Sequence, residues 1–259
     1  MEIKLDFTRS AQENANSYYQ MAKRLAKKKE GAEKAFHELE KRLKLEKEKP
    51  QELEKKRILK LEKKEWYEKF HWFFTSDGML AIGGRDAHQN EILFSRHFEE
   101  KDLFFHADVF GAPVVILKNG TNAKDETKKE VAQFAASYSR AWQSMLKSVD
   151  VYALRKEQVS KSTGKGSLGT GSFLMKGERE WYRNTALALV AFVKEGKLNI
   201  VPRITFEKLV QKSTSVVIMQ GEQKKSDAAK QISKELNYED TDTIMRQLPV
   251  GGLSINRSA

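Results

Sequence analysis

The chain has 259 residues, contains no cysteine and carries a formal net charge of +11 at pH 7. This length is enough for one or two domains with a sizeable core, and a hydrophobic content of 39% excludes a disordered chain. The lack of cysteine excludes disulfides, thiolate zinc sites, iron–sulfur ligation and a cysteine nucleophile. The excess of positive charge favours polyanionic partners such as nucleic acids.

The first residues and the apolar runs predict a soluble, cytoplasmic protein that does not enter a membrane. The opening MEIKLD lacks the basic-then-apolar build of a signal peptide. The longest apolar run, residues 186–193, is far shorter than the roughly 20 residues that a membrane span needs.

Residues 1–68 predict a coiled-coil arm. Ser10 and Glu13 have the spacing of a capping box, which starts a helix over about residues 11–48. Its candidate seam alternates spacings of three and four residues, the 3.5-residue period of coiled coils, with two charged interruptions. The seam consists of Ala15, Tyr18, Ala22, Leu25, Lys29, Ala32, Phe36, Leu39, Leu43 and Glu46.

Pro50 marks a break, because proline suits the first turn of a new helix and not a helix interior. We expect a second helix over about residues 51–69. The two helices form either an antiparallel hairpin or one bent arm that pairs with a second chain. The dense lysine and glutamate fit a solvated coiled-coil face, and they also fit a basic arm that lies along an RNA backbone.

Residues 69–259 predict an α+β domain, with a mixed β-sheet and flanking helices, because short strand patterns outnumber helical ones. The expected strands are 70–74, 79–82, 103–107, 114–117, 149–154, 172–176, 186–193, 198–201 and 215–220. The expected helices are 86–97, 124–148, 226–235 and 241–248.

Motifs for nucleotide binding and catalysis are weak. Residues 164–169 match G-x-G-x-x-G, but a strand pattern follows them where the dinucleotide fingerprint requires a helix. No Walker A motif is present. His106 and Asp108 share a strand face, so they either hold a turn by hydrogen bonds or bind a metal. We expect the first, and we expect no catalytic residues, no metal and no cofactor.

Signals for phosphate binding are better. Gly83-Gly84-Arg85 leads into a helix whose free N–H groups favour an anion, although Asp86 can cap the same helix end. Residues 151–185 hold seven basic and three acidic residues. Tyr152, Phe173, Trp181 and Tyr182 interleave with them. Positive charge that tracks a backbone and aromatic faces that stack bases are what unpaired RNA requires, although these aromatics also fit a core.

Five segments resemble the NFACT-R domain, the RNA-binding module of the NFACT family of ribosome-associated quality-control factors. They are 69–74 (KFHWFF), 82–91 (IGGRDAHQNE), 105–113 (FHADVFGAP), 158–161 (QVSK) and 170–173 (TGSF). Residues 5–35 are similar to the start of the coiled-coil middle region of that family. Phe110 departs from the family, which often has histidine there.

The resemblance implies a non-enzymatic module that binds RNA, both tRNA and large-subunit ribosomal RNA. Family members bind the large ribosomal subunit with stalled peptidyl-tRNA and recruit tRNA for untemplated C-terminal tailing. The family's N-terminal domain and helix-hairpin-helix segment have no counterpart in this sequence. The resemblance therefore implies a fragment or a short natural form that does not drive tailing alone.

The residues expected to bind RNA fall into two groups. The matched motifs contribute Arg85, Asp86, Gln89, Asn90, His106, Asp108, Lys161 and Thr170, and the basic segment adds Arg155, Lys165, Lys176 and Arg179. Two alternatives stay open: a protein-interaction scaffold that acts through a self-associating coiled coil, and a metal-dependent RNA-processing enzyme that uses His106 and Asp108.

Overall fold

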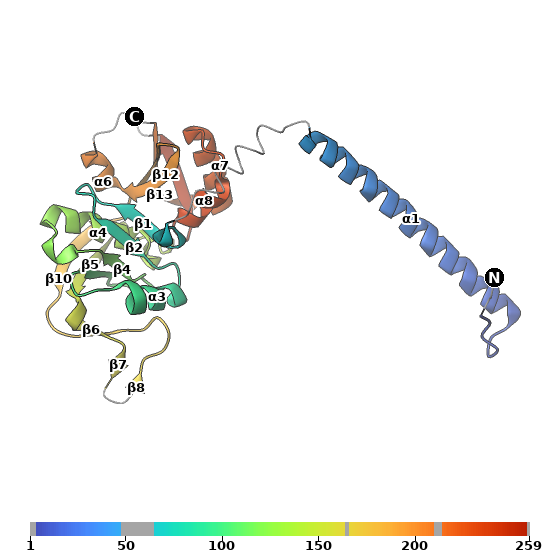
Figure 1. The fold of residues 1–259 in the computed structure, drawn as a ribbon, viewed down its shortest axis with the longest axis horizontal. Coiled ribbons are helices and arrows are strands. Elements are labelled where there is room, and N and C mark those ends of the chain that lie inside the picture. The colour runs from blue at the N-terminus through green and yellow to red at the C-terminus, as the bar shows by residue number, and fades with distance from the viewer. Residues whose placement is uncertain (1–3, 48–64, 164–165, 210–213, 258–259) are drawn as a thin grey trace. The chain divides into compact units, whose positions relative to one another are not determined.

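The computed structural model describes residues 4–47, 65–163, 166–209 and 214–257. The chain divides into two compact units, Met1–Lys64 and Glu65–Ala259, which we describe separately (Figure 1). The second helix expected over residues 51–69 lies mostly outside the described residues. Its last residues, Trp66–Lys69, form a short 3-10 turn (η1) in the second unit instead.

The first unit consists of helix α1, Ala11–Lys47, about 55 Å long at a rise of ~1.5 Å per residue. The predicted capping box is confirmed. The Ser10 backbone N–H donates to Glu13 Oε2 at 2.8 Å, and the Glu13 N–H donates to Ser10 Oγ at 3.2 Å. The seam side chains Leu25, Phe36 and Leu39 are exposed within this unit, so α1 offers an apolar stripe without a described partner in its own unit.

The second unit is built on a six-stranded sheet with the order β1-β2-β4-β3-β5-β10. Its strands are β1 (His71–Phe74), β2 (Leu80–Gly83), β3 (Leu103–Ala107), β4 (Val115–Leu117), β5 (Ser148–Arg155) and β10 (Glu180–Ala186). A four-stranded sheet has the order β12-β11-β13-β14. Its strands are β11 (Leu189–Lys194), β12 (Lys197–Pro202), β13 (Ser215–Gln223) and β14 (Leu253–Arg257).

The α+β class is confirmed, and every described strand pair is antiparallel, so the expected mixed sheet is in fact a set of antiparallel sheets. The strand expected over residues 186–193 straddles two real ones, because β10 ends at Ala186 and β11 begins at Leu189. The apolar run of residues 186–193 spans the gap between the two strands, which conceals the boundary in the sequence. The sequence patterns did not predict β14.

Helix α4, Asp125–Ser137, packs on one face of the six-stranded sheet and also reaches β12. The helix expected over residues 124–148 is therefore wrong in length. The Ser139 hydroxyl accepts a hydrogen bond from the Ala141 N–H at 3.2 Å and starts a separate helix, α5 (Arg140–Gln143). Serine favours such caps over helix interiors, and this ends the longer helical pattern.

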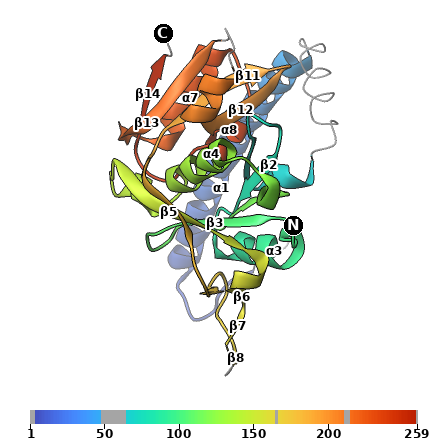
Figure 2. The ribbon, with the colours of Figure 1, turned by 90° about the vertical axis from the view of Figure 1, so that its left-hand side faces the viewer.

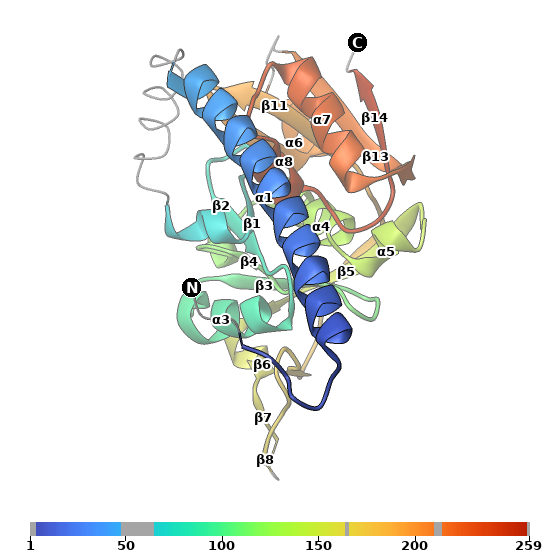
Figure 3. The same cartoon turned by 90° about the vertical axis from the view of Figure 1, so that its right-hand side faces the viewer.

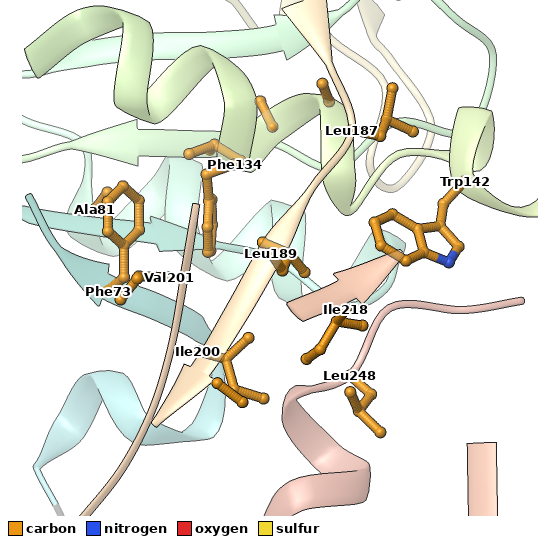
Figure 4. Close-up of a cluster of buried hydrophobic side chains, with 14 of the residues drawn as sticks. Phe73, Ala81, Phe134, Trp142, Leu187, Leu189, Ile200, Val201, Ile218 and Leu248 are labelled. Carbon is orange, nitrogen blue, oxygen red and sulfur yellow. The ribbon is translucent and has the colours of Figure 1, made fainter. Parts of the chain in front are cut away.

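The main core lies between the two sheets and around α4. Figure 4 shows Phe73, Phe134, Leu189 and Ile218 converging there from both sheets and from the helix. These four side chains are at most 1% exposed. Helices α7 (Lys225–Leu236) and α8 (Thr241–Gln247) pack beside the four-stranded sheet (Figure 2). Helix α6 (Arg203–Lys208) follows β12 in the chain.

A second apolar cluster lies on the other face of the six-stranded sheet. Helix α3, Ala87–His97, packs Leu93 against Ile82 and Phe104 of the strands. A lobe made of four short strands leads away from this side of the domain (Figures 1 and 3). The strands are β6 (Val159–Ser160), β7 (Ser162–Thr163), β8 (Gly166–Ser167) and β9 (Leu174–Met175), so the strand expected over residues 172–176 is shorter than expected.

The buried carboxylate of Glu130 ties three elements together. It accepts hydrogen bonds from the Ser76 N–H at 2.8 Å, the Thr205 hydroxyl at 3.0 Å and Lys208 Nζ at 2.8 Å. Its side chain is fully buried. The β1–β2 turn, α4 and α6 therefore share one acceptor, whose loss leaves several buried donors without a partner.

We expect Glu130→Ala to lower the free energy of unfolding by about 3 kcal/mol, because breaking a buried charge pair leaves its partners unsatisfied. The matched variant Glu126→Ala removes an exposed carboxylate from the same helix and should change stability by less than about 0.5 kcal/mol. Urea unfolding curves measure both. Equal effects of the two variants would contradict the structural role of Glu130.

Candidate nucleic-acid interface

Three aromatic rings form a row across three neighbouring strands. The strand register pairs His106 of β3 with Tyr152 of β5, and Tyr152 with Trp181 of β10. Cross-strand partners project from the same face of a sheet, so the three side chains lie side by side. The ring centroids are 5.8 Å apart for His106 and Tyr152, and 5.2 Å apart for Tyr152 and Trp181. We call this set the aromatic row.

Two arginines cover the aromatic row. The Arg179 guanidinium lies 4.4 Å from the centre of the Tyr152 ring, and Arg183 lies 3.9 Å from that of Trp181. Asp150 holds Arg183 through a 2.6 Å hydrogen bond, and this bond keeps the pKa of the Asp150 carboxyl below its ordinary value. Both arginines are exposed, so the row combines π-faces with cations that solvent reaches.

The three side chains of the row differ in solvent exposure, and this decides which of them a ligand can contact. Tyr152 is only 4% exposed, and its hydroxyl donates to Met175 Sδ at 2.8 Å. His106 and Trp181 are partly exposed. Tyr152 therefore supports the row from below, and Trp181 with the two arginines forms the surface that a nucleobase and a phosphate can reach.

The rings of the row are uncharged at neutral pH. Burial lowers the pKa of His106 below its ordinary value, and burial raises the pKa of Tyr152 above its ordinary value. The imidazole is therefore neutral and the phenol protonated. The positive charge of this surface comes from Arg179 and from Arg183, whose charge Asp150 partly offsets.

His106 and Asp108 do not form a metal-ligand cluster with a third residue. His106 Nδ1 lies 3.3 Å from the Tyr152 hydroxyl. The Asp108 backbone N–H donates to Asp150 O at 2.7 Å, and its side chain is exposed. Throughout the described ranges, no group of three or more histidine, aspartate or glutamate side chains is arranged to hold a metal ion.

Lys161 ties the lobe to α3. Its ammonium binds Glu91, donates to Gly169 O at 2.8 Å and lies 5.1 Å from the centre of the Phe173 ring. The Gly171 N–H donates to the same Glu91 carboxylate at 3.1 Å. Through these contacts, Lys161 holds the segment that carries Thr170. The side chain of Thr170 itself is exposed.

The motif around Gly84 is a capped turn, so the alternative with Asp86 as the cap is confirmed. Asp86 accepts a hydrogen bond from the Gln89 N–H at 2.8 Å and caps α3. The Gln89 side chain accepts from the Arg85 N–H at 3.1 Å, and buried Asn90 accepts from the Val114 N–H at 3.1 Å. Asp86 thus takes the helix N-terminus that we considered for a phosphate, and Asn90 joins two loops.

The remaining predicted residues are more dispersed. Arg155 pairs with Leu103 at the end of β5, and strand alternation places it on the opposite sheet face from Tyr152. Lys176 is exposed next to β9, and Lys165 lies outside the described residues. The structure therefore joins His106 and Arg179 to the aromatic row, and Arg155 lines a pocket that it shares with Arg179.

The prediction of RNA-binding residues omitted three members of this surface, Tyr152, Trp181 and Arg183. The interleaving of basic and aromatic residues was visible in the sequence, but their common face depends on the pairing of β5 with β10. Tyr182, by the same alternation, points to the other face, where its ring lies 5.8 Å from Phe105.

Comparison with known proteins shows which family the chain resembles. Residues 69–177 match the family model described as the NFACT protein RNA binding domain. The archaeal Rqc2 homolog aRqcH of Methanocaldococcus jannaschii is 37% identical over 74% of this chain and 29% of its own length. The human ribosome quality control complex subunit NEMF is 37% identical over 65% of this chain and 16% of its own length.

The second unit is an α+β domain whose residues 69–177 match an RNA-binding domain, and its antiparallel sheet exposes aromatic and basic side chains. The chain belongs to the NFACT family of ribosome quality-control factors, as its motifs indicated. It spans less than a third of the length of these curated relatives. None of the helices in the described segments is long and apolar enough to cross a membrane.

If Lys161 is a tether, its replacement should loosen the segment that it holds. In Lys161→Met, we expect the Gly171 amide to exchange with solvent at least about tenfold faster, because the charge-assisted contact that places Glu91 is lost. The matched variant Lys176→Met removes an exposed lysine from the same lobe and should leave this rate unchanged. Hydrogen-exchange mass spectrometry measures both, and unchanged exchange in Lys161→Met would contradict the tether.

Proposed function

We propose that this chain is a non-enzymatic RNA-binding module of a ribosome quality-control factor, and that unpaired RNA binds on the aromatic row. The observation that carries the proposal is the placement of Trp181 between Arg179 and Arg183 on one sheet face. Such a surface provides a stacking plane for a base and cations for the flanking phosphates.

The names of the relatives support a proposal for the wider role of this protein. The human relative is named a subunit of the ribosome quality control complex, and the archaeal relative is named for its homology to Rqc2. We propose that this chain acts in the cytoplasm, binds the large ribosomal subunit that holds stalled peptidyl-tRNA, and helps to recruit tRNA for untemplated C-terminal tailing.

The coiled-coil arm supports a second contact. Leu25, Phe36, Leu39 and Leu43 are each more than half exposed within the first unit. A seam of this kind is stable when it packs against another helix. We propose that α1 pairs through this seam, either within its own chain or with a second copy. Sedimentation equilibrium separates the two, because only the second raises the mass with concentration.

Trp181→Ala should weaken the binding of a short single-stranded RNA by about 1–3 kcal/mol, roughly 5- to 150-fold, because one stacked base loses its platform. Phe74→Ala is the matched control. It removes a half-exposed aromatic ring from β1, the opposite edge strand of the same sheet, and should leave affinity unchanged. Fluorescence anisotropy measures both affinities. Equal losses, or no loss in Trp181→Ala, would contradict the proposed site.

The arginines should control the salt dependence. Each RNA phosphate that a cation neutralises adds about −0.7 to the slope of log K against log salt for a single strand. The variant Arg179→Gln/Arg183→Gln should reduce the slope by about 1 to 1.5. Arg203→Gln, an exposed arginine on α6, is the control. A slope near zero for the unmodified chain would instead favour the protein-interaction scaffold.

Purified large subunits test the ribosomal part of the proposal. We expect subunits that carry peptidyl-tRNA to co-sediment with this chain, and Trp181→Ala to reduce the bound fraction in parallel with its loss of RNA affinity. Subunit binding that survives Trp181→Ala would assign the ribosomal contact to another surface of the chain.

A further inference from the structure

A cluster of basic side chains lies apart from the aromatic row. His71 comes from the start of β1, Arg85 from the turn after β2, Lys225 from the first residue of α7 and Arg246 from α8. Hydrogen bonds bring their segments together, because Arg85 and Gln247, the neighbours of β2 and of Arg246, both donate to the carbonyl of Phe70, which precedes His71. We call these four residues the basic cluster.

Backbone carbonyls and rings hold the basic cluster in place. Arg85 Nη2 donates to Phe70 O at 3.0 Å, and Lys225 Nζ donates to Leu248 O at 2.8 Å. The His71 ring stacks on Tyr138 with centroids 4.1 Å apart. The positions of these cations therefore follow from the packing of β1, α4, α7 and α8.

Acidic side chains offset little of the charge of the basic cluster. In the part of the chain that the structure describes, no carboxylate forms a salt bridge with Arg85, Lys225 or Arg246. Asp86 attracts Arg85 but forms no salt bridge with it, because its carboxylate is turned to the N-terminus of α3. Arg85 and Lys225 are partly buried, so solvent offsets their charge incompletely.

Two buried nitrogens of the basic cluster have no hydrogen-bond partner. They are Nε of Arg85 and Nδ1 of His71, and His71 is only 6% exposed. Buried polar groups without a partner are rare and costly, and each calls for an explanation. Burial, together with Arg85 and Lys225, holds the pKa of His71 well below its ordinary value, although a hydrogen bond with the Gln247 side chain acts in the opposite direction. An anion beside these groups would offset the repulsion and accept from the arginine.

We propose that the basic cluster binds a phosphate group, with Arg85 and Lys225 as its main ligands and Arg246 at the exposed rim. A guanidinium presents its N–H groups in a fork that matches phosphate oxygens, and an ammonium adds a compact charge. This site goes beyond the proposed function, because it does not require the aromatic row. The phosphate belongs either to an RNA backbone or to a free phosphate compound.

Isothermal titration with inorganic phosphate, at constant ionic strength set with chloride, tests the site in the full chain. We expect saturable binding that weakens about tenfold or more in Arg85→Gln and Lys225→Gln, as for lost charge-assisted hydrogen bonds. Arg246→Gln changes an exposed side chain that should not affect folding, and its expected loss is about threefold. Lys230→Gln, an exposed lysine on the same helix as Lys225, should bind phosphate as the unmodified chain does.

Two further measurements complete the test: the NMR signals of His71 and the affinity for single-stranded RNA. Phosphate should shift the NMR signals of the His71 ring, and Arg246→Gln should reduce that shift. A parallel loss of single-stranded RNA affinity in Arg246→Gln would assign the site to an RNA phosphate, and unchanged RNA affinity would assign it to a free phosphate compound. Trp181→Ala should retain phosphate binding, so failure of the aromatic row and failure of this site are distinguishable. No saturable phosphate binding, or equal binding by Arg246→Gln and Lys230→Gln, would overturn the proposal.

Discussion

The antiparallel register of β3, β5 and β10 is the constraint on which the proposed RNA surface depends. A shift of one residue between β5 and β10 would move Trp181 to the α4 face and bring Tyr182 in its place. The apolar neighbours in β5 fix that register, because Val151 and Ala153 must face the core while Tyr152 faces away from α4. Packing on one side of the sheet therefore positions the ligand surface on the other.

The irregular end of β10 adds to this arrangement. The pairing with β5 shifts register between Tyr182 and Thr185, and Asn184 has a φ of 50° in the left-handed region. Asparagine tolerates this conformation better than most residues. The Asn184 N–H donates to Asp150 at 2.8 Å, and the same carboxylate holds Arg183 over Trp181. One carboxylate thus fixes both the bulge and the cation.

Many of the polar residues in the recognised motifs stabilise the domain. Asn90 joins the loops around Gly84 and Val114, and Lys161 with Glu91 holds the lobe against α3. Gly84 shows how tight this packing is, since a Cβ there would lie 2.1 Å from Asn90 Oδ1. These contacts connect separate segments of the domain, and this connection requires particular side chains at particular positions. The motifs are therefore a guide to the fold first and to the ligand surface second.

Local patterns predicted much of the fold. The start of α1 followed from Ser10 and Glu13, and the cap of α3 followed from Asp86, because both depend on neighbours within one turn. The break at Ser139 and the boundary near Ala186 were missed, since helical spacing of large side chains continues past Ser139 and an apolar run continues past Ala186. Only part of the aromatic row could be predicted. The composition showed that aromatic and basic residues occur together, but it did not show which strands pair. The basic cluster was not foreseeable, since His71 and Lys225 are 154 positions apart in the sequence.

Photocrosslinking tests the central claim most directly, because it reports contact without any substitution in the protein. A short single-stranded RNA that carries 4-thiouridine is bound to the full chain, irradiated and digested, and the crosslinked peptides are identified by mass spectrometry. The account predicts crosslinks at Trp181 or in the peptides that carry Arg179 and Arg183. Crosslinks confined to α1 or to the four-stranded sheet would contradict it.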